Sequence, residues 1–386
     1  MIAEAFLSCG RWYSKEDIIM LAPTGRAAQR ITESTGYDAM TAQRAVMALR
    51  TGKESLPSKK LILCDESSMV DIYLFYDILK FARDCNLIFV GDIYQIASVG
   101  PGKVLKDLID CGEIPCILLT QGHRNSGSIA HNSELINAGI TIDRYEYDEH
   151  FVYIPATSEN IFDAMIDDYK KKICQYGIKN VMLCSAMKER GAVCVSKLNT
   201  RLQQDLTAGQ KEARFGNKLF RVGDRVMHTH NDYDFTIKRN GVIEKGVFNG
   251  ERGSVAKISY NYEYETYILT VLFDDGSIAN YSKNSVDSLT LAYATTLHKC
   301  QGSEADCMMM AYTYGDYILL NRALFYTGET RAKKEFRFYG EEKWKYGEML
   351  SAFDIAVGKA DDNNRNTSLA RWINEEVEAL ANENAS

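Results

Sequence analysis

Residues 61–71, LILCDESSMVD, form the stretch that decides the fold of this chain. Its four apolar residues lead directly into the carboxylates Asp65 and Glu66, which is typical of a strand buried on both faces of a parallel sheet. Comparable short apolar runs occur at 18–21, 87–90, 116–120, 151–154 and 181–184. Segments with helical spacing of apolar residues lie at 27–34, 71–84, 158–175 and 190–206. The alternation of strand and helix predicts an α/β fold built on parallel sheets.

A β-rich segment interrupts this alternation between residues 219 and 287, where short strand-like runs are divided by NG and DDG turn signals. We interpret it as a small β-barrel inserted into a second α/β unit. The sequence therefore predicts four parts: a first domain over 1–145, a second domain over 146–218 and 288–358, the inserted barrel over 219–287, and a polar tail with a short helix over 359–386.

The composition limits the class of protein. Of the 386 residues, 46% are apolar and 25% are charged, so a disordered chain is excluded. No run approaches 18 apolar residues and the start lacks the features of a signal peptide, so we expect no membrane span and a cytoplasmic location. A net charge of −7 argues against broad charge-driven binding and leaves room for a local basic groove. The 10 cysteines lack metal spacing, which favours reduced, structural thiols.

Two strand ends carry polar residues suited to nucleotide hydrolysis. Asp65 and Glu66 would lie at the carboxyl edge of the sheet, where the aspartate of a nucleotide hydrolase holds Mg²⁺ through water and the glutamate polarises the attacking water. Taken alone, the pair is more commonly an acidic turn. A neighbouring strand, LIFVGDIYQ, would bring Gln95 near Glu66, close enough to sense a γ-phosphate. The alternative for this segment is an ordinary loop between strand and helix.

Two arginines are candidates for stabilising the charge of a transferred phosphoryl group. Arg124 follows the apolar run at 116–120, and Arg331 lies on or just after a helix of the second unit. Both would reach a bound triphosphate if the two α/β units face each other. A single arginine is more commonly part of a surface salt bridge.

Eight short motifs occur in the order found in RecD-like and Dda-like superfamily 1 helicases. They are APTGRAA, DESSMVD, GDIYQIASVG, HRNSGS, LNTRLQQDL, FRVGDRVM, YATTLHKCQGSE and YTGETRAKK. The resemblance implies two RecA-like motor domains with a small SH3-like barrel inserted in the second. It also implies an ATP-driven, Mg²⁺-dependent motor that moves 5′ to 3′ on single-stranded DNA. We expect the chain to be monomeric.

The resemblance assigns roles to twelve residues. At the nucleotide, Asp65 and Glu66 resemble a Walker B pair, and Gln95 resembles a γ-phosphate sensor. Arg124 and Arg331 resemble two arginines that clamp the γ-phosphate. Two more, Gly302 and Glu304, resemble the motif that links the nucleotide to the DNA track. Two loops resemble those that contact the sugar and phosphate of DNA, and their residues are Pro23, Thr24, Gly25, Thr296 and His298.

The largest departure of the sequence from this family pattern is an absence. The P-loop, GxxxxGK[ST], does not occur in the 386 residues. Since 2–9 resembles the helix that follows the P-loop, we expect a helicase core truncated before Met1, with very low ATPase activity. Alternatives are a non-catalytic remnant that binds single-stranded DNA or acts as a scaffold, and the helicase part of a conjugative relaxase-type protein. A smaller departure is Glu329, which could offset the charge of Arg331 but which we expect to face solvent.

Overall fold

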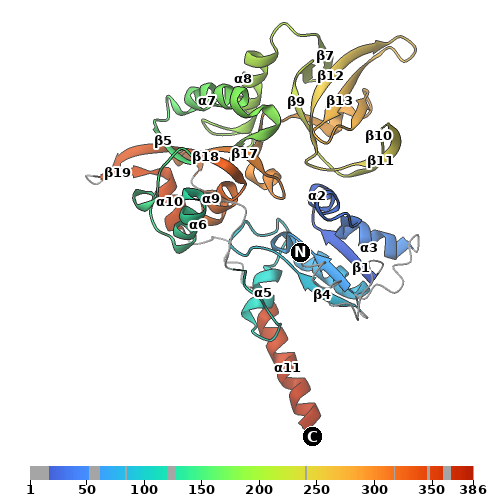
Figure 1. The fold of residues 1–386 in the computed structure, drawn as a ribbon, viewed down its shortest axis with the longest axis vertical. Helices are drawn as coiled ribbons and strands as arrows, with labels where there is room; N and C mark the ends of the chain where they lie inside the picture. The colour runs from blue at the N-terminus through green and yellow to red at the C-terminus, as the bar shows by residue number, and fades with distance from the viewer. Residues whose placement is uncertain are drawn as a thin grey trace. The chain divides into compact units, whose positions relative to one another are not determined.

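The fold is that of a computed structural model of the chain (Figure 1). The structure describes residues 17–51, 61–82, 85–119, 127–239, 241–316, 318–345, 348–359 and 367–385. The chain divides into two compact units, the first formed by 1–121 with 361–386 and the second by 122–360. Arg124 and the helix expected over 2–9 lie outside the described residues.

The first unit contains a parallel four-stranded sheet in the order β2-β1-β3-β4. Its strands are β1 (Ile18–Ala22), β2 (Ala39–Thr41), β3 (Leu61–Cys64) and β4 (Asn86–Phe89). The register aligns Leu21 with Cys64 and Cys64 with Phe89, so three strands end at the same level. The loops that follow these strands therefore meet at one edge of the sheet.

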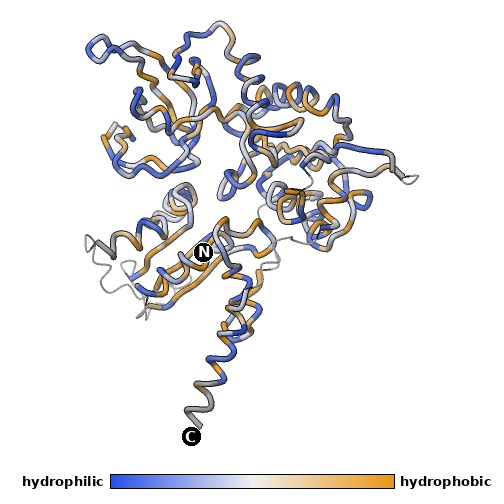
Figure 2. Tube along the Cα trace, turned by 180° about the vertical axis from the view of Figure 1, so that it is seen from behind, coloured by the Kyte–Doolittle hydropathy of each residue, from blue (hydrophilic) through white to orange (hydrophobic). Residues whose placement is uncertain are grey.

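Helices cover both faces of this sheet. The α2 helix (Gly25–Thr35) buries Ala27, Ala28 and Ile31 against one face, which includes Ile18 and Met20 of β1. The α3 helix (Ala42–Thr51) and the α4 helix (Ile72–Phe81) pack on the opposite face. Successive residues of β1 thus face different cores, which is why its sequence is apolar without alternation. In Figure 2 the strands of this sheet are drawn largely in the apolar colour.

The strand expected over 116–120 does not form in its described part, residues 116–119, so this prediction is wrong. The side chains of Ile117, Leu118 and Leu119 are 87%, 78% and 77% exposed. A strand needs a neighbouring backbone to pair with. Among the described strands, β4 is the last of the sheet order and pairs with β3 alone. Residues 116–119 pair with no strand in the described part of the chain, although β4 leaves one edge open there.

The second unit contains a sheet in the order β16-β6-β17-β18, with β5 on the other side of β18. All of these pairings are parallel, and β19 (Glu348–Ser351) adds an antiparallel pairing to the far end of β18. The parallel strands are β5 (Phe151–Ala156), β6 (Val181–Ser185), β16 (Ala294–Thr296), β17 (Ala305–Tyr312) and β18 (Ala332–Lys345).

Helices also form a layer on each face of the second sheet (Figure 1). The α7 helix (Ile161–Tyr176) and the α8 helix (Val195–Thr207) pack on one face through a core that includes Met165 and Leu198. On the other face lie α6 (Ser128–Ala138), α9 (Arg322–Glu329) and α10 (Ala352–Gly358). The core there is aromatic, and the ring of Phe353 stacks on that of Tyr312 with a centroid distance of 4.3 Å.

Between α8 and β16 the chain forms an antiparallel seven-stranded sheet in the order β11-β10-β14-β13-β12-β9-β15. Its strands are β9 (Arg225–His228), β10 (Asp232–Arg239), β11 (Val242–Val247), β12 (Arg252–Asn261), β13 (Thr266–Phe273), β14 (Ile278–Tyr281) and β15 (Leu289–Leu291). A hairpin of β7 (Glu212–Phe215) and β8 (Lys218–Arg221) precedes it. The β-rich segment thus forms its own core, with buried residues such as Val255, Leu269 and Phe273.

The C-terminal helix α11 (Leu369–Ala385) returns to the first unit. Leu369 and Ile373 pack against the core that α4 covers, and the Thr367 hydroxyl donates to Asp107 of α5 (Val104–Asp110). The sequence predicts the end of the first domain at residue 145, and in the structure α6 packs on α9 within the second unit. Among the described residues, no helix is both long and apolar enough to cross a membrane.

Candidate functional site

Three loops meet at the carboxyl edge of the first unit's sheet, and each carries residues singled out from the sequence. Pro23, Thr24 and Gly25 follow β1, Asp65 and Glu66 follow β3, and the loop to Gln95 follows β4. Backbone hydrogen bonds hold the loops together: the amide of Asp65 donates to the carbonyl of Leu21 at 2.9 Å, and the amide of Ser67 donates to that of Val90 at 2.8 Å. The predicted assembly at one sheet edge is therefore present.

Glu66 has an unusual backbone conformation. Its φ of 51° lies in the left-handed region, which costs a residue with a side chain on the order of 1–3 kcal/mol. The Asp65 carboxylate accepts a hydrogen bond from the Glu66 amide at 2.8 Å and so supports this turn. Strain of this kind is most often kept where the direction of a side chain matters.

Gln95 is held by a neighbouring aspartate. Its side-chain amide donates to Asp92 Oδ2 at 3.3 Å, while Asp92 Oδ1 accepts from the Tyr94 amide at 2.9 Å. Gln95 is 8% exposed, and its Oε1 atom is buried without a hydrogen-bond partner among the described residues. Buried polar atoms are normally satisfied, so this oxygen is available to accept a hydrogen bond from a bound group.

Gly91 allows two of the loops to approach closely. A Cβ atom at this position would lie 2.9 Å from the Ser68 amide nitrogen and 3.0 Å from that of Ser67. It would also lie 2.8 Å from a methyl carbon of Leu105. The glycine therefore serves close packing of the β4 loop onto the segment after Glu66, which goes beyond the turn geometry that the sequence suggested.

The turn from β1 into α2 presents a helix N-terminus at the same edge. Thr24 is the N-cap residue of α2, and its hydroxyl accepts a hydrogen bond from the Ala27 amide at 3.2 Å. The first amides of a helix and the positive end of its dipole favour phosphate oxygens. This geometry suits the sugar and phosphate contact expected for Pro23, Thr24 and Gly25.

In the second unit, Thr296 and His298 lie at the end of β16. Asn199 of α8 holds the first residue of this strand with two hydrogen bonds. Its Oδ1 accepts from the Ala294 amide at 2.8 Å, and its Nδ2 donates to the Ala294 carbonyl at 3.0 Å. Thr296 occupies the N-cap position of the short helix η6 (Leu297–Cys300), where its side chain makes no capping hydrogen bond, and the His298 side chain is exposed. The family motif LNTRLQQDL thus positions the loop of the motif YATTLHKCQGSE.

Gly302 and Glu304 lie between η6 and β17. Gly302 has a φ of +69°, a conformation that favours glycine. Glu304 forms an ion pair with Lys333 of β18, with 3.1 Å between Oε2 and Nζ. The carbonyl of Arg331 accepts a hydrogen bond from the Ala305 amide at 3.1 Å, so Glu304 and Arg331 lie at the adjacent starts of β17 and β18.

Glu329 does not face solvent, so this prediction is wrong. It is 0% exposed, and its carboxylate accepts from the Ser133 hydroxyl of α6 at 2.7 and 2.8 Å. Burial raises the pKa of Glu329 to about 8, against the opposing effects of Ser133 and Arg331. Arg331 itself is 1% exposed. Glu329 is buried because α9 packs directly on β17: a Cβ atom on Gly328 would lie 2.7 Å from the Met310 sulfur. This close packing encloses the last residues of α9.

Sequence reasoning missed a buried aspartate that joins two motifs. Asp224 of FRVGDRVM is 0% exposed and accepts hydrogen bonds from two side chains of α8, Gln203 at 2.5 Å and Thr207 at 2.8 Å. It also accepts from the Tyr293 hydroxyl at 3.0 Å and the Arg221 amide at 2.7 Å. A lone Asp in a turn carries no local sign of this role. The only sequence signal for this contact would have been that the motifs LNTRLQQDL and FRVGDRVM each contain polar residues among apolar ones.

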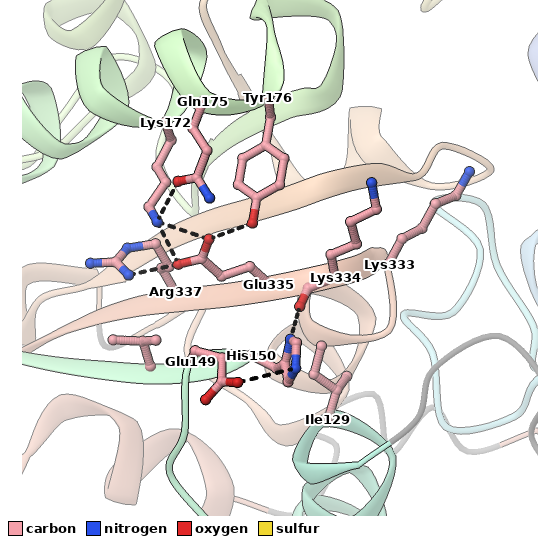
Figure 3. Close-up of a pocket in the computed structure, with 11 residues that line it drawn as sticks. Ile129, Glu149, His150, Lys172, Gln175, Tyr176, Lys333, Lys334, Glu335 and Arg337 are labelled. Atoms are coloured by element: carbon pink, nitrogen blue, oxygen red, sulfur yellow. Dashed lines mark hydrogen bonds and ion pairs between the residues drawn. The ribbon is translucent and has the colours of Figure 1, made fainter.

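A pocket of about 510 Å³ in the second unit contains none of the predicted site residues (Figure 3). Its cations are already paired with anions: Lys172 lies 2.8 Å from Glu335, and Arg337 lies 2.7 Å from Glu335 and 2.6 Å from Asp168. The Tyr176 hydroxyl also donates to Glu335 at 3.1 Å. This mutual neutralisation suits a structural ionic network and leaves little charge for a nucleotide.

Comparison with known families agrees with these motifs. Residues 2–152 match the model of an AAA domain, 198–273 match the SH3 domain of ATP-dependent RecD-like DNA helicases, and 291–339 match the UvrD-like helicase C-terminal domain. The chain is therefore similar to RecD-like helicases over most of its length. The predicted resemblance and the predicted fold class, two RecA-like sheets with an SH3-like insertion, are both confirmed.

Individual RecD-like relatives match along most of the chain. It is 28% identical over 369 residues to the ATP-dependent RecD2 DNA helicase of Deinococcus radiodurans, with 92% of this chain and 46% of the relative covered. It is 26% identical to the RecBCD enzyme subunit RecD of Mycolicibacterium smegmatis, with 84% and 62% covered. The chain thus spans about half to three fifths of the length of these relatives.

A solved structure also shares the fold. The Pif1 helicase from Bacteroides, in complex with ADP-AlF3 and single-stranded DNA, superposes with a TM-score of 0.50 at 18% identity. The alignment covers 84% of this chain and 83% of that one.

Proposed function

We propose that this chain is the motor core of an ATP-dependent DNA helicase that moves 5′ to 3′ on single-stranded DNA. The observation that carries the proposal is the first unit's sheet edge. There Glu66 is held in a strained backbone conformation, and Gln95 keeps a buried oxygen unsatisfied. The relatives named as DNA helicases support the same activity.

The residues at this edge fit a nucleotide with Mg²⁺. A carboxylate such as Asp65 is the type of ligand that Mg²⁺ prefers, usually with several waters retained. When bound, ATP with Mg²⁺ supplies the phosphoryl group that is transferred to water. Glu66 would orient that water and hold its proton, and the free oxygen of Gln95 would accept a second hydrogen bond from it. Arg331, and Arg124 outside the described residues, would stabilise charge on the phosphoryl group.

The DNA track would use one loop from each unit. In the first, the capped N-terminus of α2 after Pro23 offers backbone amides to a phosphate. In the second, Thr296 and the exposed His298 lie at the end of β16. Gly302 and Glu304 follow directly and would link this track to the nucleotide. Such local contacts explain how a chain with a net charge of −7 binds DNA.

We further propose that the 386-residue chain hydrolyses ATP weakly by itself. The phosphate-cradling GxxxxGK[ST] is not among its residues, so the nucleotide would lack the contacts that this loop provides. The same observation favours the second candidate, a non-catalytic core that keeps binding to single-stranded DNA.

ATP turnover with and without single-stranded DNA tests both proposals. We expect turnover close to background for the 386-residue chain. A rate of about 10 per second, which is typical of enzymes, would contradict the weak-ATPase proposal. If Glu66→Gln abolished that rate, the motor assignment would stand. The matched control is Glu265→Gln, because Glu265 also has a positive φ, of 45°, but lies in the hairpin turn between β12 and β13 of the barrel.

Binding of a fluorescently labelled oligonucleotide tests the DNA track. Affinity should fall as salt rises, since phosphate contacts release counterions. We expect His298→Ala to weaken binding about fivefold, which corresponds to about 1 kcal/mol. The control is Tyr262→Ala, an 86% exposed aromatic residue in the barrel. Equal effects of the two substitutions would contradict the assignment.

A further inference from the structure

Two cysteine sulfurs lie almost within bonding distance beside the predicted DNA loop. Cys184 is near the end of β6, and Cys300 is the last residue of η6. Their Sγ atoms are 2.8 Å apart, and both residues are 0% exposed. A disulfide bond is about 2.05 Å long, so the two atoms are less than 1 Å further apart than in a covalent bond. The strand pairing of Thr295 with Cys184 sets this closeness, because η6 turns back over β6 directly after β16.

A buried arginine from the inserted barrel faces this pair. Arg252, the first residue of β12, donates from Nη2 to Thr295 Oγ1 at 3.1 Å and to Cys300 Sγ at 3.4 Å. It is 7% exposed, and its Nε has no partner among the described residues. The Asp274 carboxylate, which also influences the pKa of Arg252, is already bound in a bidentate pair by Arg225. The charge of Arg252 is thus balanced mainly at the Cys300 sulfur.

The two sulfurs are chemically different because of this neighbour. Burial alone would raise the pKa of Cys300, but the hydrogen bond with Cys184 and the charge of Arg252 outweigh it and lower the pKa to about 6. Burial raises the pKa of Cys184 well above its ordinary value. One thiolate and one thiol side by side are the arrangement from which a disulfide forms after oxidation.

We propose that Cys184 and Cys300 form a reversible oxidation site, in which a peroxide converts them to an intrachain disulfide. The disulfide thereby weakens the binding of the adjacent loop to DNA. The Cys300 thiolate attacks one peroxide oxygen, the O–O bond breaks, and the leaving hydroxide takes a proton from solvent, so that a sulfenic acid and one water form. The Cys184 sulfur then attacks the sulfenic sulfur and releases a second water. Hydrogen peroxide is reduced to two waters while two thiols are oxidised to one disulfide, so atoms and electrons balance.

The effect on DNA, which rests on the proposed function, follows from the position of Cys300. It lies two residues after His298 and two before Gly302. Disulfide formation would pull the end of η6 toward β6 and remove the negative charge beside Arg252. The guanidinium would then face a neutral disulfide in a buried site, which is unfavourable. Both changes would shift η6, the element that presents His298. Because the sulfurs are buried, oxidation would proceed through local opening of this loop.

Peptide mapping of the full chain tests the disulfide independently of any DNA activity. The chain is treated with hydrogen peroxide and digested without reduction, and the peptides are identified by mass spectrometry. We expect a linked pair containing Cys184 and Cys300 that dithiothreitol separates and that Cys184→Ser abolishes. Cys174→Ser, at an exposed cysteine, is the matched control and should leave the link intact. If Cys184 and Cys300 remain thiols while Cys174 becomes oxidised, the proposal is overturned.

Affinity for a single-stranded oligonucleotide tests the consequence. We expect the oxidised chain to bind at least about fivefold more weakly than the reduced chain, in the range of typical coupling between sites. Dithiothreitol should restore binding, and Cys184→Ser should make binding insensitive to peroxide. A mapped disulfide with unchanged affinity would overturn the regulatory part. If the reduced chain fails to bind DNA, the proposed function fails together with this effect, whereas the mapping still decides the disulfide.

Discussion

The candidate residues of the two units are held in opposite ways. At the sheet edge of the first unit, Asp65, Glu66 and Gln95 lie in loops and are supported by short local contacts, such as those of Asp65 to the Glu66 amide and Gln95 to Asp92. In the second unit, two residues within the motifs, Asp224 and Glu329, are buried and are bonded to distant parts of the chain, as Glu329 is to Ser133. The first arrangement presents side chains to a ligand, and the second fixes the positions of loops through buried contacts.

This difference separates residues that matter mainly for activity from residues that matter mainly for stability. A residue in a loop at the sheet edge can be exchanged with less effect on folding, so its loss should show mainly in activity. A buried polar residue with several partners cannot be exchanged so easily, because each partner left without a hydrogen bond costs free energy. Four substitutions measure how far this contrast extends.

The largest effect is expected at Asp224. Asp224→Ala removes a buried acceptor from four donors on α8, β8 and the segment before β16. We expect the free energy of unfolding to fall by about 4 kcal/mol. The comparison is Asp65→Ala in the first unit, expected to change stability by less than about 1 kcal/mol. Urea unfolding followed by circular dichroism measures both, and similar values for the two would remove the contrast.

The next effect concerns pH and Glu329. Its pKa rises from 4.5 in the unfolded chain to about 8 in the folded one, mainly through burial. The folded state therefore holds a proton that the unfolded state releases, and stability falls as pH rises between these values. Relative to the natural chain, Glu329→Gln should gain on the order of 3 kcal/mol between pH 5 and pH 8.

The groups that face this carboxyl are Ser133, Arg331 and Tyr145, and none of them is altered in the comparison. Unfolding in urea at pH 5, 7 and 8 gives the slope for each variant. Glu159→Gln, at an exposed carboxylate, is the control and should follow the natural chain. A natural chain whose stability is flat across this range would show that Glu329 is ionised throughout.

A smaller effect is expected at Gly91, where the first unit is packed as tightly as the second. Gly91→Ala would place a methyl carbon about 3 Å from two backbone amides that have little room to move. We expect a loss of about 2 kcal/mol, which is typical of overpacking. Gly112→Ala has open space around its Cβ position, and at its φ of +75° it reports backbone strain alone. A temperature melt of both variants separates the two causes.

The smallest effect is expected at Glu66. Glu66→Gly relieves the left-handed strain, so stability should be unchanged or rise by about 1 kcal/mol. Any ATP turnover should be lost at the same time. Loss of both stability and turnover would mean that Glu66 supports the fold, which would place it with the buried residues of the second unit.

Much of this molecule could be predicted because its signals are local. The runs at 18–21, 61–64 and 87–90 are strands, and three of the expected loops do meet at one sheet edge. The strand expected at 116–120 fails for a physical reason: an apolar run becomes a strand only when a partner backbone lies beside it. Glu329 was unpredictable in the same way, since a carboxylate between polar neighbours is normally exposed.

The sequence by itself determined the order of strands and helices, the inserted barrel and the identity of the helicase motifs, because apolar periodicity and motif spacing act over a few neighbouring residues. Only the tertiary structure decided which distant side chains share a buried site. Ser133 and Glu329 are 196 residues apart, and Cys184 and Cys300 are 116 apart. Such pairs depend on sheet order and helix packing, and whether a buried group is charged depends on the neighbours that the packing supplies.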